Sequence, residues 1–248
     1  MHFELHLSFM SLSDKHVFFD LDRTLWDFDS NSKNALLQVF EELDLIDIFR
    51  TFDRFYNAYV AQNARLWQLY GEGQISKDVL RYERFNATLM QFNIDNIDLA
   101  KEIGSMYVSI SPSQKKLFPG TITCLDDLRS IGFHLHIITN GFEEVQYIKL
   151  QNCGLDGFFD VIVCSEAVGQ NKPARAIFQY ALKEAGCKAE NAIMIGDDFR
   201  ADISGALNSG MKAIHFDPHG WSEENYPHTC KSLSELPLMV TQLLLASN

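Results

Sequence analysis

Two aspartates stand one residue apart where a short apolar run ends. The segment from His16 to Asp27 is HVFFDLDRTLWD, in which Asp20 and Asp22 follow residues typical of a buried strand. Alternate side chains of an extended chain point to one side about 6.6 Å apart, so we expect both carboxylates to face one site. At an effective dielectric constant near 20 they repel by roughly 3 kcal/mol, which a bound cation or a proton must offset. The pair therefore predicts a site for a divalent metal ion.

Polar residues also follow three later predicted strands. They are Thr139 and Asn140 after the strand 133–139, Lys172 after the strand 159–164, and Asp197, Asp198 and Asp202 after the strand 192–196. Each alone has an ordinary structural explanation, such as a helix cap or a solvated lysine. Because ligands bind at the carboxyl ends of parallel strands, the residues together predict one site.

Lys172 stands in a position that is unusual for a cation. Pro173 suits the first position of a helix, which would place Lys172 at the helix cap, where the macrodipole disfavours positive charge. This placement indicates an anionic partner for the lysine. Two kinds of partner for Lys172 remain open and are compatible with each other: a phosphoryl group, and a salt bridge to Asp197 or Asp202.

The elements that must position these residues follow two different patterns. From about residue 30 to residue 111 the apolar residues have a helical period, with predicted helices at 30–43, 52–70, 76–89 and 97–110. Such a segment predicts a small helical bundle inserted into the chain.

From Phe118 onward, helix and strand patterns alternate, which predicts a parallel sheet with helices on both faces. The predicted strands are 16–19, 133–139, 159–164, 192–196 and 211–216, and the predicted helices are 119–132, 142–150, 173–185, 201–209 and 233–245. The predicted domains are an α/β core of residues 1–28 and 112–248 and a helical domain of residues 29–111.

Charge and cysteine usage limit the partners and the compartment. Lys and Arg number 21 against 33 Asp and Glu, a net charge of −12 that argues against a nucleic-acid polymer or an anionic membrane as partner. The five cysteines have no paired spacing, and no segment has transmembrane length or the features of a signal peptide. We expect a cytoplasmic protein with reduced thiols, a short tail before the first strand and Met10 as an alternative start.

The four groups of polar residues resemble the motifs of the haloacid dehalogenase (HAD) superfamily. Asp20-Leu-Asp-Arg-Thr24, Thr139, Lys172, and Gly196-Asp197 with Asp202 match the four motifs in order. The segments FFDLDRTLWDF, ITNGF and NKP resemble most the pyrimidine 5′-nucleotidase subfamily, which acts on ordinary and noncanonical pyrimidine nucleoside monophosphates. Arg23 stands where relatives often carry histidine or glycine. The resemblance implies a Rossmann-like, doubly wound parallel sheet with an inserted helical cap.

The resemblance also implies a role for each motif residue. Asp20 is the expected nucleophile, forming an aspartyl-phosphate, and Asp22 the expected general acid and base. Mg²⁺ would be held by Asp20, the backbone carbonyl of Asp22 and Asp197. The remaining residues are expected to bind phosphate (Thr139, Asn140 and Lys172) or to support the site (Thr24, Asp198 and Asp202).

These roles predict a Mg²⁺-dependent phosphomonoester hydrolase that acts on a small phosphate ester. The first candidate for its substrate is a nucleoside 5′-monophosphate. The alternatives are a phosphatase for another metabolite such as a sugar phosphate or phosphoglycolate, a phosphomutase, and a catalytically idle binding protein. Asp22 argues against a dehalogenase, which needs no acid at that position. We expect the aromatic residues of the insert either to pack in its core or to stack on a base; they are Tyr56, Tyr59, Trp67 and Tyr70. We expect Trp26 and Phe28 either to line the pocket or to pack at the hinge of the insert.

Overall fold

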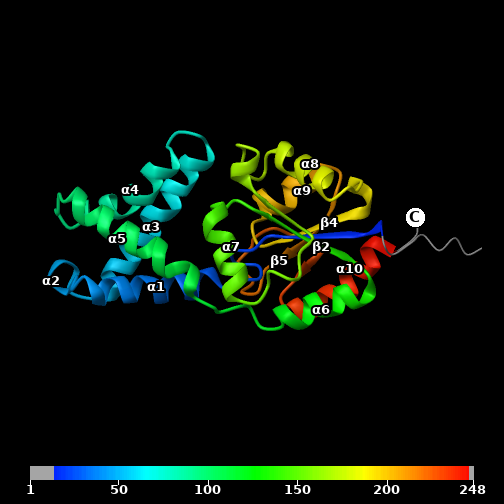
Figure 1. The fold of residues 1–248 in the computed structure, drawn as a ribbon, viewed down its shortest axis with the longest axis horizontal. Coiled ribbons are helices and arrows are strands. Elements are labelled where there is room, and N and C mark those ends of the chain that lie inside the picture. Colours follow the sequence, from blue (N-terminus) through cyan, green and yellow to red (C-terminus); the bar gives the residue numbers. More distant parts are fainter. Residues whose placement is uncertain (1–13, 246–248) are drawn as a thin grey trace, which may run out of the picture. The chain divides into compact units, whose positions relative to one another are not determined.

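The computed structural model describes residues 14–245, so the predicted tail and alternative start at Met10 lie outside the described residues. One unit of the structure is built on a six-stranded, all-parallel sheet in the order β3-β2-β1-β4-β5-β6 (Figure 1). Its strands are β1 (His16–Phe19), β2 (His134–Thr139), β3 (Val161–Cys164), β4 (Ala192–Gly196), β5 (Lys212–Phe216) and β6 (Thr229–Cys230). The strand order reverses direction between β1 and β4, and the carboxyl ends of these two strands are therefore where a ligand is expected.

Helices cover both faces of this sheet, as the alternating pattern predicts. In Figure 1, α6 (Thr121–Ile131) and α10 (Leu236–Leu245) lie on one face, and α8 (Arg175–Glu184) and α9 (Gly205–Asn208) lie on the other. Val17, Phe18 and Phe19 of β1 are fully buried because apolar residues enclose the central strand from both sides. The predicted Rossmann-like sheet is confirmed.

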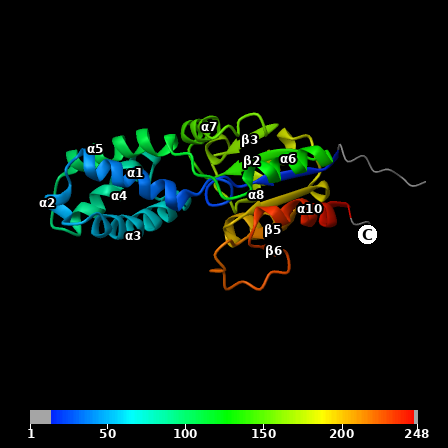
Figure 2. The same ribbon diagram turned by 90° about the horizontal axis from the view of Figure 1, so that it is seen from below.

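The inserted segment forms a helical unit with its own core. Its helices are α1 (Phe28–Glu42), α2 (Ile46–Phe49), α3 (Phe52–Gly71), α4 (Lys77–Met90) and α5 (Ile97–Ile110), which gather into one bundle (Figure 2). Side chains of Thr51, Ser76 and Asn96 cap α3, α4 and α5 by accepting hydrogen bonds from backbone N–H groups. By contacts, this unit comprises residues 27–116 together with residues 144–153, which include most of α7 (Glu143–Asn152). The predicted domain boundaries at residues 29 and 111 stay a prediction.

Several element boundaries differ from the predicted ones. Phe133 does not begin β2, because its backbone N–H closes the end of α6 by bonding to the Leu128 carbonyl. The third strand begins at Val161, two residues later than predicted. The predicted helix 201–209 is a π-helical segment, Phe199–Ser204, followed by α9.

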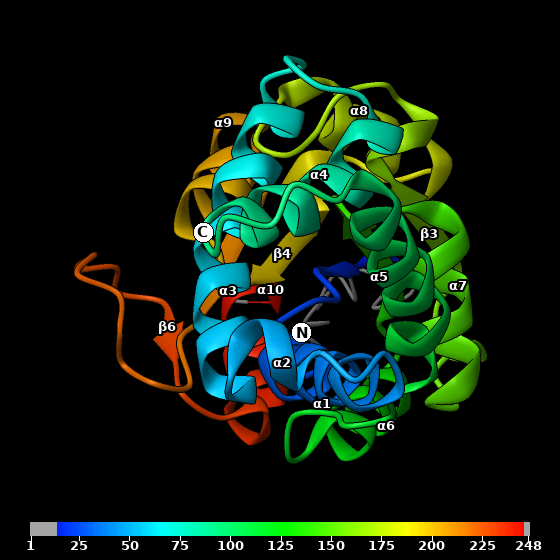
Figure 3. The same cartoon turned by 90° about the vertical axis from the view of Figure 1, so that its left-hand side faces the viewer.

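Two short elements were not predicted at all. These are the single-turn helix α2 and the two-residue edge strand β6, and the chain between β5 and β6 projects beyond the sheet edge (Figure 3). Across the part of the chain that the structure describes, no helix is both long enough and apolar enough to cross a bilayer.

Candidate active site

The first motif lies where the chain leaves the central strand of the sheet. The Asp20 N–H bonds to the Ile195 carbonyl at 2.8 Å, which extends the β1–β4 pairing to the end of the strand. Arg23 then takes a positive φ of 67°, and the chain turns back so that the Trp26 N–H reaches the Leu21 carbonyl. Asp20 is buried and Asp22 is half-buried. The turn gives the two aspartates different surroundings although they are one residue apart.

Lys172 connects the ends of three strands. Its Nζ donates to Asp20 Oδ1 at 2.6 Å and to the Ile138 carbonyl at 2.7 Å, and it forms an ion pair with Asp202 Oδ1 at 2.6 Å. The lysine is 5% exposed. The predicted placement at a helix cap is wrong, because α8 begins at Arg175 with Ala174 as its N-cap. The anionic partners are supplied across the sheet, and the predicted salt bridge to Asp202 is present. The contact of Lys172 with a phosphoryl group stays a prediction.

Three carboxylates converge beside this lysine. Oxygen atoms of Asp20, Asp197 and Asp202 lie within 4.8 Å of one another, with Asp20 and Asp202 buried. Lys172 offsets one of the three negative charges when all are ionised, which leaves two. Carboxylate oxygens are the ligands that a hard divalent cation prefers, so the donor set and its charge fit Mg²⁺.

The crowding of these acids raises their pKa values. Burial raises the pKa of Asp20 to about 7, the charges of Asp202 and Asp22 act in the same direction, and Lys172 opposes them. Burial and the nearby charge of Asp20 hold the pKa of Asp197 well above its usual range. A bound dication would favour ionised carboxylates and reverse these shifts.

Backbone geometry after β4 fixes the position of Asp202. At Gly196 a Cβ atom would collide with the Asp202 carboxylate, so this approach needs glycine. The Asp198 N–H donates to Asp202 Oδ2 at 3.1 Å, while the Asp198 carboxylate caps the π-helical segment by accepting from the Ala201 N–H at 2.8 Å. Asp198 therefore orients Asp202 and is itself occupied as a helix cap.

The remaining predicted residues surround this cluster. The Thr24 hydroxyl approaches Asp197 Oδ1 at 3.4 Å, and Thr139 Oγ1 accepts from the Gly141 N–H at 3.1 Å. The Asn140 side chain brackets the backbone of Lys172, accepting from its N–H at 2.8 Å and donating to its carbonyl at 3.2 Å. Asn140 thus positions the lysine, and its predicted contact with phosphate stays a prediction.

His215 was not predicted as a site residue. Its Nε2 lies 3.0 Å from the Asp197 carbonyl, and β5 pairs it directly with Gly196. A histidine at the end of the fifth predicted strand was the available signal, because every other strand end there carries a polar residue.

One of the four candidate aromatic residues of the insert, Tyr59, is a core residue. Tyr59 is 1% exposed and packs in the apolar cluster of the helical unit, with Tyr56 against it. Trp67 and Tyr70 are half-buried and contact each other edge to face at 5.7 Å. Trp26 is fully buried in the unit that contains the sheet. Packing therefore accounts for Tyr59 and Trp26.

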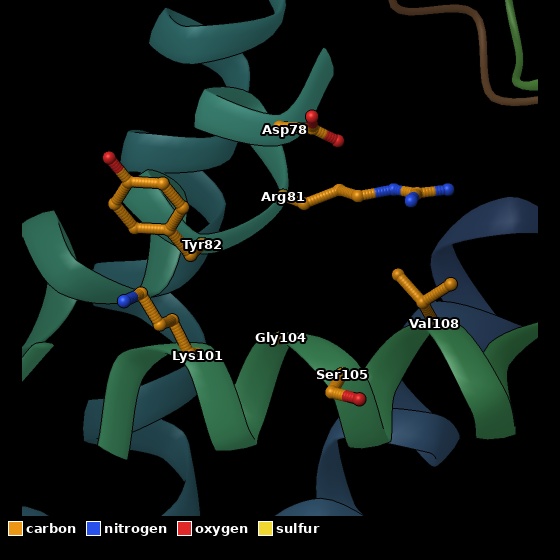
Figure 4. A pocket seen from close by; sticks show the side chains of 7 residues that line it. All are labelled: Asp78, Arg81, Tyr82, Lys101, Gly104, Ser105 and Val108. Carbon is orange, nitrogen blue, oxygen red and sulfur yellow. The ribbon is translucent and has the colours of Figure 1, made fainter. Parts of the chain in front are cut away.

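A separate hollow of about 360 Å³ lies between α4 and α5 (Figure 4). Arg81 and Tyr82 extend from α4 in different directions along it, and Lys101 and Ser105 come from α5. The helices approach closely at Gly104, where a Cβ atom would lie 2.8 Å from the Arg81 carbonyl oxygen. This hollow contains none of the motif residues.

Comparison with known proteins identifies the family. The family model of haloacid dehalogenase-like hydrolases matches residues 15–210. The chain belongs to this family. It is 34% identical over 205 residues to the pyrimidine 5′-nucleotidase YjjG of Escherichia coli (strain K12), covering 82% of this chain and 86% of that protein. It is also 34% identical to a glyceraldehyde 3-phosphate phosphatase of Methanothermobacter thermautotrophicus, covering 81% of this chain and 84% of that one.

A solved structure agrees with the fold of this HAD-like hydrolase. The HAD-hydrolase YfnB from Bacillus subtilis, bound to magnesium, superimposes with a TM-score of 0.82 at 28% identity, covering 92% of this chain and 98% of that chain. The predicted superfamily and the predicted enzyme class, a phosphoric monoester hydrolase, are confirmed. The substrate, the metal and the individual residue roles are matters of proposal.

Proposed function

We propose that this HAD-like hydrolase is a Mg²⁺-dependent phosphatase of nucleoside 5′-monophosphates, with a preference for pyrimidines. The observation that carries the proposal is the convergence of Asp20, Asp197 and Asp202 within 4.8 Å beside the buried ammonium of Lys172. A dianionic phosphoryl group needs positive charge around it, which Lys172 and a divalent cation supply together. The pyrimidine preference is supported by the similarity to two pyrimidine 5′-nucleotidases, at 34% and 31% identity.

In the proposed mechanism, a carboxylate oxygen of Asp20 attacks phosphorus in line with the ester oxygen. The bond from phosphorus to that oxygen breaks, and Asp22 donates the proton that the departing alkoxide requires. Water then attacks phosphorus while Asp22 accepts one of its protons, which releases inorganic phosphate and restores Asp20. The half-buried position of Asp22 suits this proton exchange with solvent.

Asp20 and Asp197 would hold Mg²⁺ together with the Asp22 backbone carbonyl, and Asp202 would keep Lys172 in place. The bound ion supplies charge that stabilises the transferring phosphoryl group. Thr139 and Lys172 would bind the phosphoryl oxygens.

A phosphate-release screen tests the proposed activity. With Mg²⁺, we expect turnover of the generic substrate p-nitrophenyl phosphate, faster turnover of pyrimidine monophosphates than of sugar phosphates, and loss of activity with a chelator. Turnover of p-nitrophenyl phosphate also excludes an idle binding protein. If sugar phosphates rank first, the nucleotidase assignment is wrong and a sugar phosphatase replaces it, a candidate favoured by the 34% identity to the glyceraldehyde 3-phosphate phosphatase.

We expect the metal-free protein to lose stability as the pH rises from about 4 to about 7. The pKa of Asp20 is raised from 3.8 to about 7, so in this window the folded protein retains a proton that the unfolded chain releases. The loss is at most about 4 kcal/mol for this shift. Because Mg²⁺ binds the ionised carboxylates, it should raise the melting temperature more at alkaline than at acidic pH. Thermal unfolding with and without Mg²⁺ measures this, and equal shifts at both pH values would contradict a carboxylate metal site.

A further inference from the structure

A second cation is buried inside the helical unit. Arg84 of α4 is 4% exposed, and its guanidinium approaches polar atoms of α3. Its Nη1 lies 3.2 Å from Asn63 Oδ1 and 3.4 Å from the Tyr59 hydroxyl, which itself donates to Asn63 Oδ1 at 3.1 Å. Close by, Ser32 of α1 and Tyr107 of α5 share a hydrogen bond at 2.9 Å. Four helices thus bring polar groups into an otherwise apolar bundle.

This guanidinium lacks a negative partner. No carboxylate among residues 14–245 forms an ion pair with Arg84, and its buried Nε has no hydrogen-bond partner there. Arg84 lies over the rings of Tyr107 and Phe85, at 4.9 and 5.2 Å from the ring centroids. Cation–π contacts of this kind are weaker than the cost of removing a cation from water. The charge of Arg84 is therefore left largely uncompensated.

The hydrogen-bonding groups that remain available around Arg84 are donors. Asn63 Oδ1 is already occupied by Tyr59 and Arg84, which leaves the Asn63 amide N–H groups and the remaining guanidinium N–H groups to bind a ligand. A cationic, donor-rich site selects an acceptor that carries negative charge. We propose that Arg84 and Asn63 form a binding site for an oxyanion, a carboxylate or a phosphate, of a small molecule.

This site is distinct from the aspartate cluster, because all its residues belong to the helical unit and the cluster belongs to the unit with the sheet. The oxyanion that we propose is a free anion that binds within the helical unit and acts as an effector.

The test compares the variant Arg84→Met with a matched control, Arg54→Met. Arg54 also lies over an aromatic ring of the helical unit, Phe92, but is exposed.

The test needs no catalytic activity and does not depend on the proposed function. In metal-free buffer, sodium malonate should raise the melting temperature of the wild type and of Arg54→Met above the value in sodium chloride of equal ionic strength, but not that of Arg84→Met. Asn63→Asp places a carboxylate where Asn63 Oδ1 now lies, 3.2 Å from Arg84, and should raise the melting temperature and remove the response to malonate. This variant keeps the test valid if Arg84→Met fails to fold.

A melting-temperature response to malonate in the wild type and in Arg54→Met that is absent in Arg84→Met supports the oxyanion site. A wild type that does not distinguish malonate from chloride overturns it. Destabilisation by Asn63→Asp also overturns it, because an uncompensated cation must gain from a neighbouring carboxylate.

Discussion

Replacing Asp20 with Asn is expected to reduce phosphate release by about 10⁴-fold or more, because a neutral amide cannot attack phosphorus to form the proposed ester. The variant should nevertheless fold. The amide oxygen can still accept the hydrogen bond that Lys172 now donates to Asp20 Oδ1 at 2.6 Å, and the exchange removes one of three crowded negative charges. The metal-free variant should therefore be at least as stable as the wild type at alkaline pH. Steady-state phosphate release and thermal unfolding measure the two effects.

Asp22→Asn provides the matched comparison for this prediction. Loss of a general acid and base lowers the rate by about 100-fold or more, but the half-buried Asp22 should contribute little to stability. The nucleophile assignment fails if Asp20→Asn releases phosphate at the wild-type rate on a good substrate. It also fails if the two substitutions are equivalent on a substrate whose leaving group needs no proton, because only Asp22 is expected to become less important there.

The sequence predicts the strands that carry the site more accurately than it predicts the geometry around those strands. The strand β1 and the polar residues at strand ends are visible because buried parallel strands are continuous apolar runs that end in groups unable to be buried alone. The predicted placement of Lys172 at a helix cap was wrong, because Pro173 is a helix-start signal that acts only locally. The helix begins two residues later, and the partners of Lys172 come from β1 and from the segment after β4.

The features that could not be predicted depend on contacts between distant segments. Gly196 belongs to the fourth motif by resemblance, but the physical need for glycine there arises only because the Asp202 carboxylate folds back against it. The edge strand β6 has two residues, too few for a periodic pattern. Arg84 had a usable signal, because it shares the buried face of α4 with Leu80 and Thr88, four residues to either side, where a charge is unexpected.

Removing the charge of Lys172 should have the largest effect on stability. Lys172→Met leaves Asp20 and Asp202 buried without the ammonium that lies 2.6 Å from each, and breaking a buried ion pair in this way costs about 3–5 kcal/mol. Activity should be lost as well, because no cation then replaces Lys172 at the phosphoryl group. Urea unfolding at neutral pH measures the loss of stability.

The pH dependence of this loss identifies its cause. Lys172 lowers the pKa values of Asp20 and Asp202, so its removal raises both, and the variant should recover stability as the pH falls and the two carboxylates take up protons. Lys15→Met is the matched control. Lys15 is also buried, at 4% exposed, but its Nζ donates to the neutral Asn191 side chain at 2.6 Å, so this variant should keep its activity and show no recovery in acid. A Lys172→Met protein that unfolds at the wild-type urea concentration, or whose deficit is the same at acidic and neutral pH, would show that the buried carboxylates do not depend on this lysine.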